Sequence, residues 1–156
     1  MTNRSKDTCA DEHAARAPAD PAERGAASDP AELELVLDRT VQAPALARYA
    51  ITERCERLGV DGSVAQSLIL LVSEVVSNAV RHSAADPDEP VELDATFGQR
   101  TIRVTVTDAG EGFTPRPRDP TSAHDGYGLY LLEKVAASWG VESCGDTKVW
   151  FELARG

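Results

Sequence analysis

Apolar and polar residues alternate along this chain with two different periods, and together these periods predict eight elements. Alternation with a period of two is typical of half-buried strands, whereas apolar residues three and four positions apart are typical of one helical face. Two hairpin-like strand pairs favour an α+β fold, a mixed, mostly antiparallel sheet with its helices on one face. The predicted order is a strand at 33–37, helices at 44–58 and 63–83, strands at 91–97 and 101–107, a helix at 126–139, and strands at 141–144 and 148–153.

Each predicted helix has an apolar face that should pack against the sheet. In the first helix this face comprises Leu46, Tyr49, Ala50, Ile51, Cys55 and Leu58. In the second it comprises Leu68, Leu71, Val72, Val75, Val76 and Ala79. In the third it comprises Leu129, Leu132, Val135, Ala136 and Trp139, and Gly140 is expected to end the helix.

Composition limits the class of protein. Residues 1–31 have few large apolar side chains, which predicts a disordered tail before one domain at 32–156. A formal net charge of −10 argues against a nucleic-acid partner. The chain shows no signal peptide and no apolar run of about 18 residues, so no membrane span is expected. Three distant cysteines, Cys9, Cys55 and Cys144, predict no disulfide framework and a reducing compartment, which indicates a cytoplasmic protein.

The helix at 63–83 also carries a row of polar residues beside its apolar face. Glu74, Asn78 and His82 recur every four positions, so they line the edge where the core meets solvent. Mg²⁺ takes few ligands from protein, and one amide oxygen from Asn78 would serve. Glu74 could accept a proton from an attacking hydroxyl, while His82 and Arg81 could reach phosphate oxygens. Taken alone, the row is also typical of a solvated helix edge.

Two glycine-containing stretches follow the strand at 101–107 and precede the third helix. Asp108 could accept a hydrogen bond from the exocyclic amine of adenine, and the carbonyl of guanine would be repelled there. Gly110 and Gly112 allow a sharp turn and the close approach of a flat ring. Gly126 and Gly128 leave N–H groups at the start of a helix, which favours an anion such as phosphate. Each stretch alone is equally consistent with an ordinary turn or helix start.

The order of these motifs resembles that of one known family. Four stretches carry the resemblance, which covers residues 32–154, and they read SEVVSNAVRHS, VTDAGEGF, DGYGLYLLEKVAASWGV and VWFEL. Together they resemble the GHKL-type (Bergerat) ATP-binding fold, a two-layer α/β sandwich. Within that group the chain is most similar to the small bacterial anti-sigma-factor serine/threonine kinases, the RsbW/SpoIIAB-like family.

The resemblance implies ATP and Mg²⁺ as ligands. Asn78 would be the magnesium ligand, and Glu74 the base toward a substrate hydroxyl. The other implied positions are adenine contacts at Asp108, Gly110 and Gly112, phosphate contacts at Gly126, Gly128 and Leu129, and a lid at 114–125. Many relatives carry a Thr directly before the Val-Trp of the last strand; here Lys148 holds that place and Thr147 is one residue back, so no adenine contact is assigned there.

The resemblance also implies a function. Such kinases transfer the γ-phosphate of ATP to a Ser or Thr of an anti-anti-sigma (STAS-type) protein, and they sequester a sigma factor. The alternative is an ATP-dependent protein-binding regulator with little or no kinase activity. A detached histidine-kinase catalytic domain would need a helical segment with a phosphoacceptor histidine, and His13 lies in a stretch without apolar periodicity. Relatives often form homodimers, but the sequence leaves the oligomeric state open.

Overall fold

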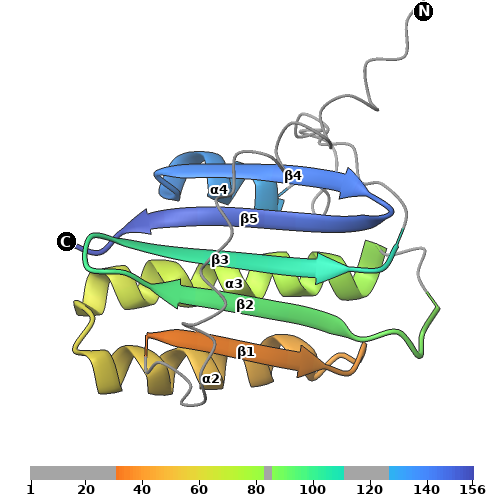
Figure 1. Cartoon of the computed structure of the whole chain (residues 1–156), viewed down its shortest axis with the longest axis horizontal. Helices are drawn as coiled ribbons and strands as arrows, with labels where there is room; N and C mark the ends of the chain where they lie inside the picture. The colour runs from red at the N-terminus through yellow and green to blue at the C-terminus, as the bar shows by residue number, and fades with distance from the viewer. Residues whose placement is uncertain (1–30, 83–85, 111–126) are drawn as a thin grey trace, which may run out of the picture.

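The described part of the chain forms a five-stranded sheet, and its helices pack on one face of this sheet (Figure 1). The computed structural model describes residues 31–82, 86–110 and 127–156. The strand order is β1-β2-β3-β5-β4, and each neighbouring pair of these strands is antiparallel. The predicted α+β two-layer fold is therefore confirmed. The elements are β1 (Glu32–Leu37), α2 (Ala43–Leu58), α3 (Gly62–His82), β2 (Val91–Phe97), β3 (Thr101–Asp108), α4 (Tyr127–Val135), β4 (Ser138–Cys144) and β5 (Asp146–Ala154).

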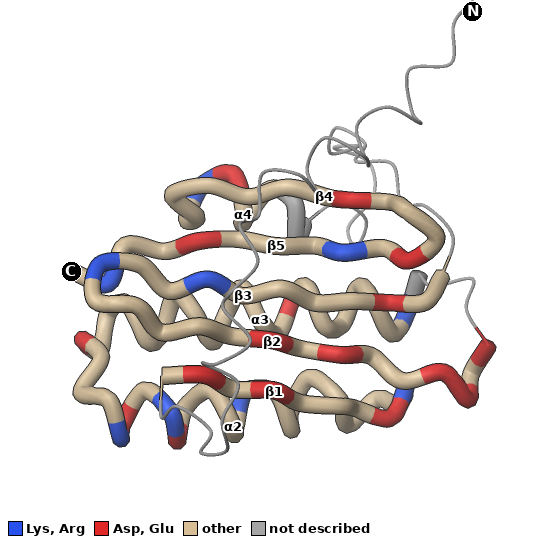
Figure 2. Tube along the Cα trace, viewed as in Figure 1, with Lys and Arg blue, Asp and Glu red and all other residues tan. Residues whose placement is uncertain are grey.

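Alternation in β2 and β3 divides the sheet into two chemically different faces. The inner face lies under the helices, and no helix of the described residues covers the outer face. Figure 2 shows acidic residues along β1 and β2, and the alternation of burial assigns Glu34 and Asp94, which lie directly opposite each other, to the outer face. The buried residues of β2 and β3 on the inner face are Val91, Leu93, Ala95, Phe97, Ile102, Val104 and Val106.

Helix α3 supplies the centre of the core. The residues predicted to pack, Leu68, Leu71, Val72, Val75 and Val76, are all buried, and Ala79 packs against them. Among the described residues, the segment Gly62–Arg81 is long and apolar enough to cross a membrane by length and composition, contrary to the expectation from the sequence. Because its apolar side chains pack in the core, this hydropathy is that of a core helix.

The buried face of α2 differs from the predicted one. Leu46 and Tyr49 are 55% and 65% exposed, so their assignment to the core is wrong. Ile51 and Cys55 are buried as predicted, and the small residues Ala43 and Ala47 take the remaining buried positions. The helix ends at Gly59, which adopts a left-handed conformation with φ of 60°. Every fourth residue forms the buried face: Ala43, Ala47, Ile51 and Cys55.

The third helix is shorter than predicted, because strand pairing begins where the helical pattern seemed to continue. Helix α4 ends at Val135, and the backbone N–H of Ala137 already donates to the carbonyl of Glu152 in β5 at 2.8 Å. Trp139 therefore belongs to β4 and not to the helix. Gly140 is a position of close approach in β4, since a Cβ there would lie 2.8 Å from the ring of Trp150.

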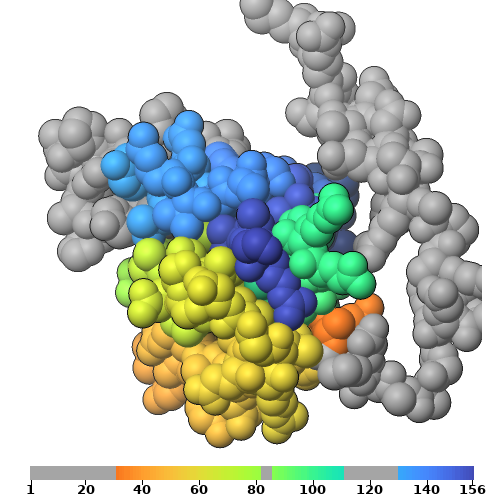
Figure 3. Space-filling view, turned by 90° about the vertical axis from the view of Figure 1, so that its left-hand side faces the viewer, coloured from red at the N-terminus to blue at the C-terminus, as the bar shows by residue number. Residues whose placement is uncertain are grey.

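The C-terminal residues tie separate elements together at one end of the sheet (Figure 3). Arg155 donates from Nη1 to the carbonyl of Gly98, in the turn between β2 and β3, at 2.8 Å. Its Nη2 donates to the carbonyl of Leu58, at the end of α2, also at 2.8 Å. The last residues of the chain thus join the sheet to the helical layer.

The cysteines differ from one another in state. Cys55 is a buried free thiol whose pKa is raised by burial. Cys144 is disulfide-bonded, so the expectation that the cysteines form no disulfide is wrong for this residue. The cysteines consequently give no argument for a reducing compartment.

Candidate functional site

Asp108, the last residue of β3, is a buried carboxylate at the end of the sheet. The alternation that places Val104 and Val106 on the inner face places Asp108 there as well, and it is only 7% exposed. A carboxylate at such a position is costly unless it accepts hydrogen bonds. The donors around Asp108 therefore determine how it is held.

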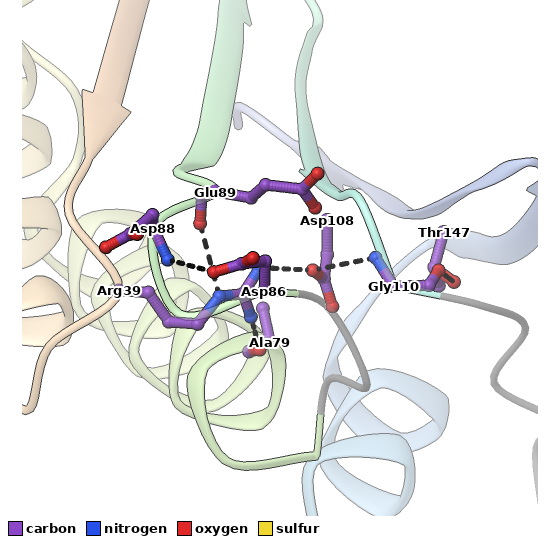
Figure 4. A network of polar contacts seen from close by, with 8 residues as sticks. All are labelled: Arg39, Ala79, Asp86, Asp88, Glu89, Asp108, Gly110 and Thr147. Carbon is purple, nitrogen blue, oxygen red and sulfur yellow. Dashed lines mark hydrogen bonds and ion pairs between the residues drawn. The ribbon is translucent and has the colours of Figure 1, made fainter.

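Arg39, in the segment between β1 and α2, provides the first of these donors (Figure 4). Its Nη2 lies 2.6 Å from Oδ1 of Asp108, and both side chains are nearly inaccessible, at 6% and 10% exposure. Its Nη1 donates to the carbonyl of Ala79 in α3 at 2.7 Å. Its Nε donates to the carbonyl of Glu89, just before β2, at 3.2 Å. One guanidinium group thus joins the end of β3 to the last turns of α3.

Gly110 is held by side chains on both of its backbone polar groups. Its N–H donates to Oδ1 of Asp108 at 3.2 Å. Its carbonyl accepts from Oγ1 of Thr147 at 3.0 Å. Thr147 is 7% exposed and lies directly opposite Asp108 in the β3–β5 ladder. The predicted turn after β3 is therefore fixed at Gly110, and Thr147 belongs to the site.

Glu74 and Asn78 lie on the edge of α3 that turns toward α4. Ser67 lines a hollow together with Val135, at the end of α4. Residues seven and eleven positions further along a helix point within about 20° of the same direction, so Glu74 and Asn78 share the edge of Ser67. Both are half-buried, and Arg81, near the end of α3, is exposed. His82 is the last residue of α3.

The positions of α3 and α4 along their helix axes can be compared, because the two helices lie side by side at one end. Helices α3 and α4 run in opposite directions on the inner face, because α4 ends beside the beginning of α3 (Figure 1). Seven residues back from Val135 is Gly128, and seven residues forward from Ser67 is Glu74; each distance is about 10 Å along its helix. The first turn of α4, which begins at Tyr127, therefore lies about level with Glu74 along the helix axes.

The donor groups present fit a cation that takes few ligands from protein. Among residues 31–82, 86–110 and 127–156, no group of three or more His, Cys, Asp or Glu could hold a metal ion. The half-buried amide of Asn78 and carboxylate of Glu74 offer oxygen atoms. This set suits Mg²⁺, which completes its shell with water and phosphate oxygens.

The structure brings Asp108 and Gly110, at the end of β3, to the last turns of α3, which carry Asn78. Asn78 directly precedes Ala79. The guanidinium of Arg39 donates both to the carbonyl of Ala79 and to the carboxylate of Asp108. Gly112, Gly126 and the predicted lid at 114–125 lie outside the described residues, as does most of the predicted tail.

The sequence interpretation missed two residues. Thr147 could have been found by counting in steps of two from the buried Phe151, which places it on the inner face. Arg39 left no comparable signal, because a single arginine after a strand is usually solvated and its partner Asp108 is 69 residues away.

Three solved structures are similar to this chain, and the first of them supports the fold. The RsbU and RsbW domains of Rv1364c from Mycobacterium tuberculosis match with 23% identity and a TM-score of 0.64, over 80% of this chain and 32% of that one. The histidine kinase domain of a blue-light activated histidine kinase from Erythrobacter litoralis EL346 matches with 28% identity over 59% of this chain and 45% of that one, with a TM-score of 0.46. A second structure of the E. litoralis kinase has 29% identity over 62% and 32% of the chains, with a TM-score of 0.49.

This chain spans about a third of the length of the M. tuberculosis structure. A comparison with curated proteins finds no match. The sequence model of the histidine kinase-like ATPase domain matches residues 36–152, three quarters of the chain, and membership in such a family implies ATP binding. The GHKL-type fold that the resemblance predicted is confirmed, and the chain belongs to the histidine kinase-like ATPase domain family.

Proposed function

We propose that this chain is an ATP-binding, anti-sigma-factor-like serine/threonine protein kinase. It would phosphorylate an anti-anti-sigma (STAS-type) partner and sequester a sigma factor in the cytoplasm. The observation that carries the proposal is that one guanidinium, that of Arg39, joins Asp108 at the end of β3 to the carbonyl of Ala79, beside Asn78 in α3. The proposed kinase domain comprises residues 32–156.

In this proposal the end of β3 recognises the base of ATP. The carboxylate of Asp108 would accept the exocyclic amine of adenine, and the carbonyl of guanine would be repelled. Gly110 has no side chain, so the ring can approach its backbone. Thr147 supports this contact by holding the carbonyl of Gly110. Gly112 belongs to the same proposed adenine-binding stretch.

The helices would hold the phosphates. The free N–H groups at the start of α4, at Gly128 and Leu129, favour anions, and Gly126 precedes them. Arg81 and His82 would add positive charge at the end of α3. Asn78 would supply a ligand to Mg²⁺, which when bound neutralises phosphate charge.

Glu74 would act as the base for transfer to the partner protein. Its half-buried carboxylate lies one helical turn before Asn78, on the same edge of α3. There it would accept the proton of a Ser or Thr hydroxyl as that oxygen attacks the γ-phosphate. A general base of this kind contributes typically about 10²–10⁴-fold to the rate.

The choice of partners follows the resemblance and one structural relative. The M. tuberculosis structure is described as containing an RsbW domain, the class of anti-sigma kinase that the sequence resembles. Phosphorylation would add about −2 of charge to the bound partner and weaken its interface with the kinase. The freed kinase would then bind the sigma factor.

Labelled ATP incubated with the chain and a candidate anti-anti-sigma protein tests the proposal. Wild type should transfer phosphate to a Ser or Thr, and Glu74→Gln should do so at least about 100-fold more slowly with ATP binding retained. Glu56→Gln, at an exposed position of α2, is the matched control and should behave as wild type. Tight ATP binding by wild type without any transfer would refute the kinase and favour the binding regulator.

A further inference from the structure

Arg39 makes three hydrogen bonds through a side chain that is 6% exposed. The acceptors belong to three separate segments: the end of α3, the residues before β2, and the end of β3. A planar guanidinium with all three contacts made has a fixed position and orientation. It differs in this respect from Arg103 on the outer face, which is 45% exposed in its pair with Glu152.

The position of Arg39 determines the orientation of Asp108. Oδ1 of that carboxylate accepts from Nη2 of Arg39 at 2.6 Å and from the N–H of Gly110 at 3.2 Å. Figure 4 shows the two donors on opposite sides of Asp108. With Oδ1 held between two fixed donors, the plane of the carboxylate and the direction of Oδ2 are also fixed.

We propose that Arg39 is a positioning residue that sets the preference of the site for adenine over guanine, through the orientation of Asp108. The inference rests on the proposed role of Asp108 in base recognition. A fixed carboxylate oxygen accepts the adenine amine at little further cost in ordering and repels the guanine carbonyl at the same place. A carboxylate that can rotate discriminates less, because it can turn away from guanine.

The competing explanation is that Arg39 only ties the β1–α2 segment to the sheet. Both explanations predict that Arg39→Met lowers the melting temperature, since the substitution removes the cation facing a buried carboxylate. Only positioning predicts a change in the ratio of ATP to GTP affinity that depends on Asp108. That ratio is therefore the decisive measurement.

The experiment measures dissociation constants for ATP and GTP, with Mg²⁺, in five proteins besides wild type. They are Arg39→Met, Arg39→Lys, Asp108→Asn, the double variant Arg39→Met/Asp108→Asn, and the control Arg103→Met. Arg39→Met should reduce the ATP preference at least about tenfold, the effect of one charge-assisted hydrogen bond. Arg39→Lys should retain an intermediate preference, because it keeps the charge without the planar fork. Arg103→Met should leave the preference unchanged.

The double variant separates positioning from a general loss of structure. If Arg39 acts through Asp108, adding Arg39→Met to Asp108→Asn changes the preference no further. If Arg39→Met proves unfolded, the double variant and Arg39→Lys still decide, since the first removes both charges of the pair and the second keeps both. A wild-type preference in Arg39→Met or in Arg39→Lys, or an equal loss from Arg39→Met in both backgrounds, overturns the inference.

The outcomes also distinguish this inference from the proposed function. An unchanged preference in Asp108→Asn overturns both the base assignment and the role of Arg39. A loss in Asp108→Asn with a retained preference in Arg39→Met overturns only the role of Arg39. Absence of phosphate transfer by wild type overturns the kinase proposal and does not affect this binding measurement.

Discussion

Thr147→Val removes a hydroxyl from the candidate site and keeps the shape of the side chain. Thr147 is 7% exposed, and its Oγ1 donates to the carbonyl of Gly110 at 3.0 Å. A hydrogen bond of this kind contributes about 0.5–1.5 kcal/mol net, whereas a buried acceptor left without its donor costs about 1–3 kcal/mol. We therefore expect the free energy of unfolding to fall by about 1–3 kcal/mol.

The same substitution should weaken ATP binding. Gly110 donates to Oδ1 of Asp108, so a looser turn at Gly110 weakens one of the hydrogen bonds that hold the carboxylate. The loss of one hydrogen bond corresponds to an affinity lowered by up to about tenfold.

Urea unfolding followed by tryptophan fluorescence gives the stability, and calorimetric titration with Mg-ATP gives the affinity. Thr147→Ser keeps the hydroxyl and should cost only about 0.8 kcal/mol for the missing methyl group. Thr107→Val is the matched control, because it lies next to Asp108 but points to the outer face opposite Lys148. Wild-type stability in Thr147→Val, or equal damage in Thr147→Ser, would refute the role given to the hydroxyl.

Three further predictions address other parts of the chain. Asn78→Ala should abolish the Mg²⁺ dependence of ATP binding, and equal affinities with and without chelator in wild type would contradict the metal role. Hydrogen bonds from Arg103 and then Ser138 lower the pKa of the Glu152 carboxyl. The ionised carboxylate therefore stabilises the folded state at pH values above the ordinary pKa of a glutamate, and this stabilisation is lost as the pH falls through the lowered pKa. Glu152→Gln should thus be less stable than wild type at pH 7, by up to about 1 kcal/mol, and equal to it in strong acid, as urea unfolding at both pH values would show. Gly140→Ala should displace the Trp150 ring, at a cost of about 1–3 kcal/mol visible as a lower melting temperature and altered tryptophan fluorescence.

The predicted fold was accurate where one physical signal determines an element. In α3 the spacing of large apolar residues identified the buried face, and alternation in β2 and β3 identified theirs. In α2 the spacing correctly selected Ile51 and Cys55 but also selected Leu46 and Tyr49, whereas the structure buries Ala43 and Ala47 instead. At Trp139 the helical spacing continued into residues that instead pair with β5, because strand pairing is a tertiary contact that local periodicity does not contain.

The sequence proposed part of the candidate site. Asp108 and Asn78 were selected from residue type and motif order, and in the structure Arg39 joins Asp108 to the carbonyl of Ala79, the residue after Asn78. Predicting Thr147 required the register of β5. The sequence left open whether Thr147 or Lys148 faces the inner side of the sheet. Arg39 required the three-dimensional fold itself, since its acceptors at Ala79 and Asp108 lie far from it in sequence.

The buried carboxylate is where the stability of the domain and the proposed selectivity depend on the same contacts. Arg39 from the first connection and Thr147 from the last strand act on one turn, from opposite sides of Asp108. Burial of an ion pair alone adds little to stability, because desolvation offsets the attraction. We therefore relate this pair, at the end of a central strand, to the base recognition proposed for Asp108. A base that binds at Asp108 would therefore respond to packing around residue 39 without touching it, so that changes in the β1–α2 segment reach the nucleotide through a single guanidinium.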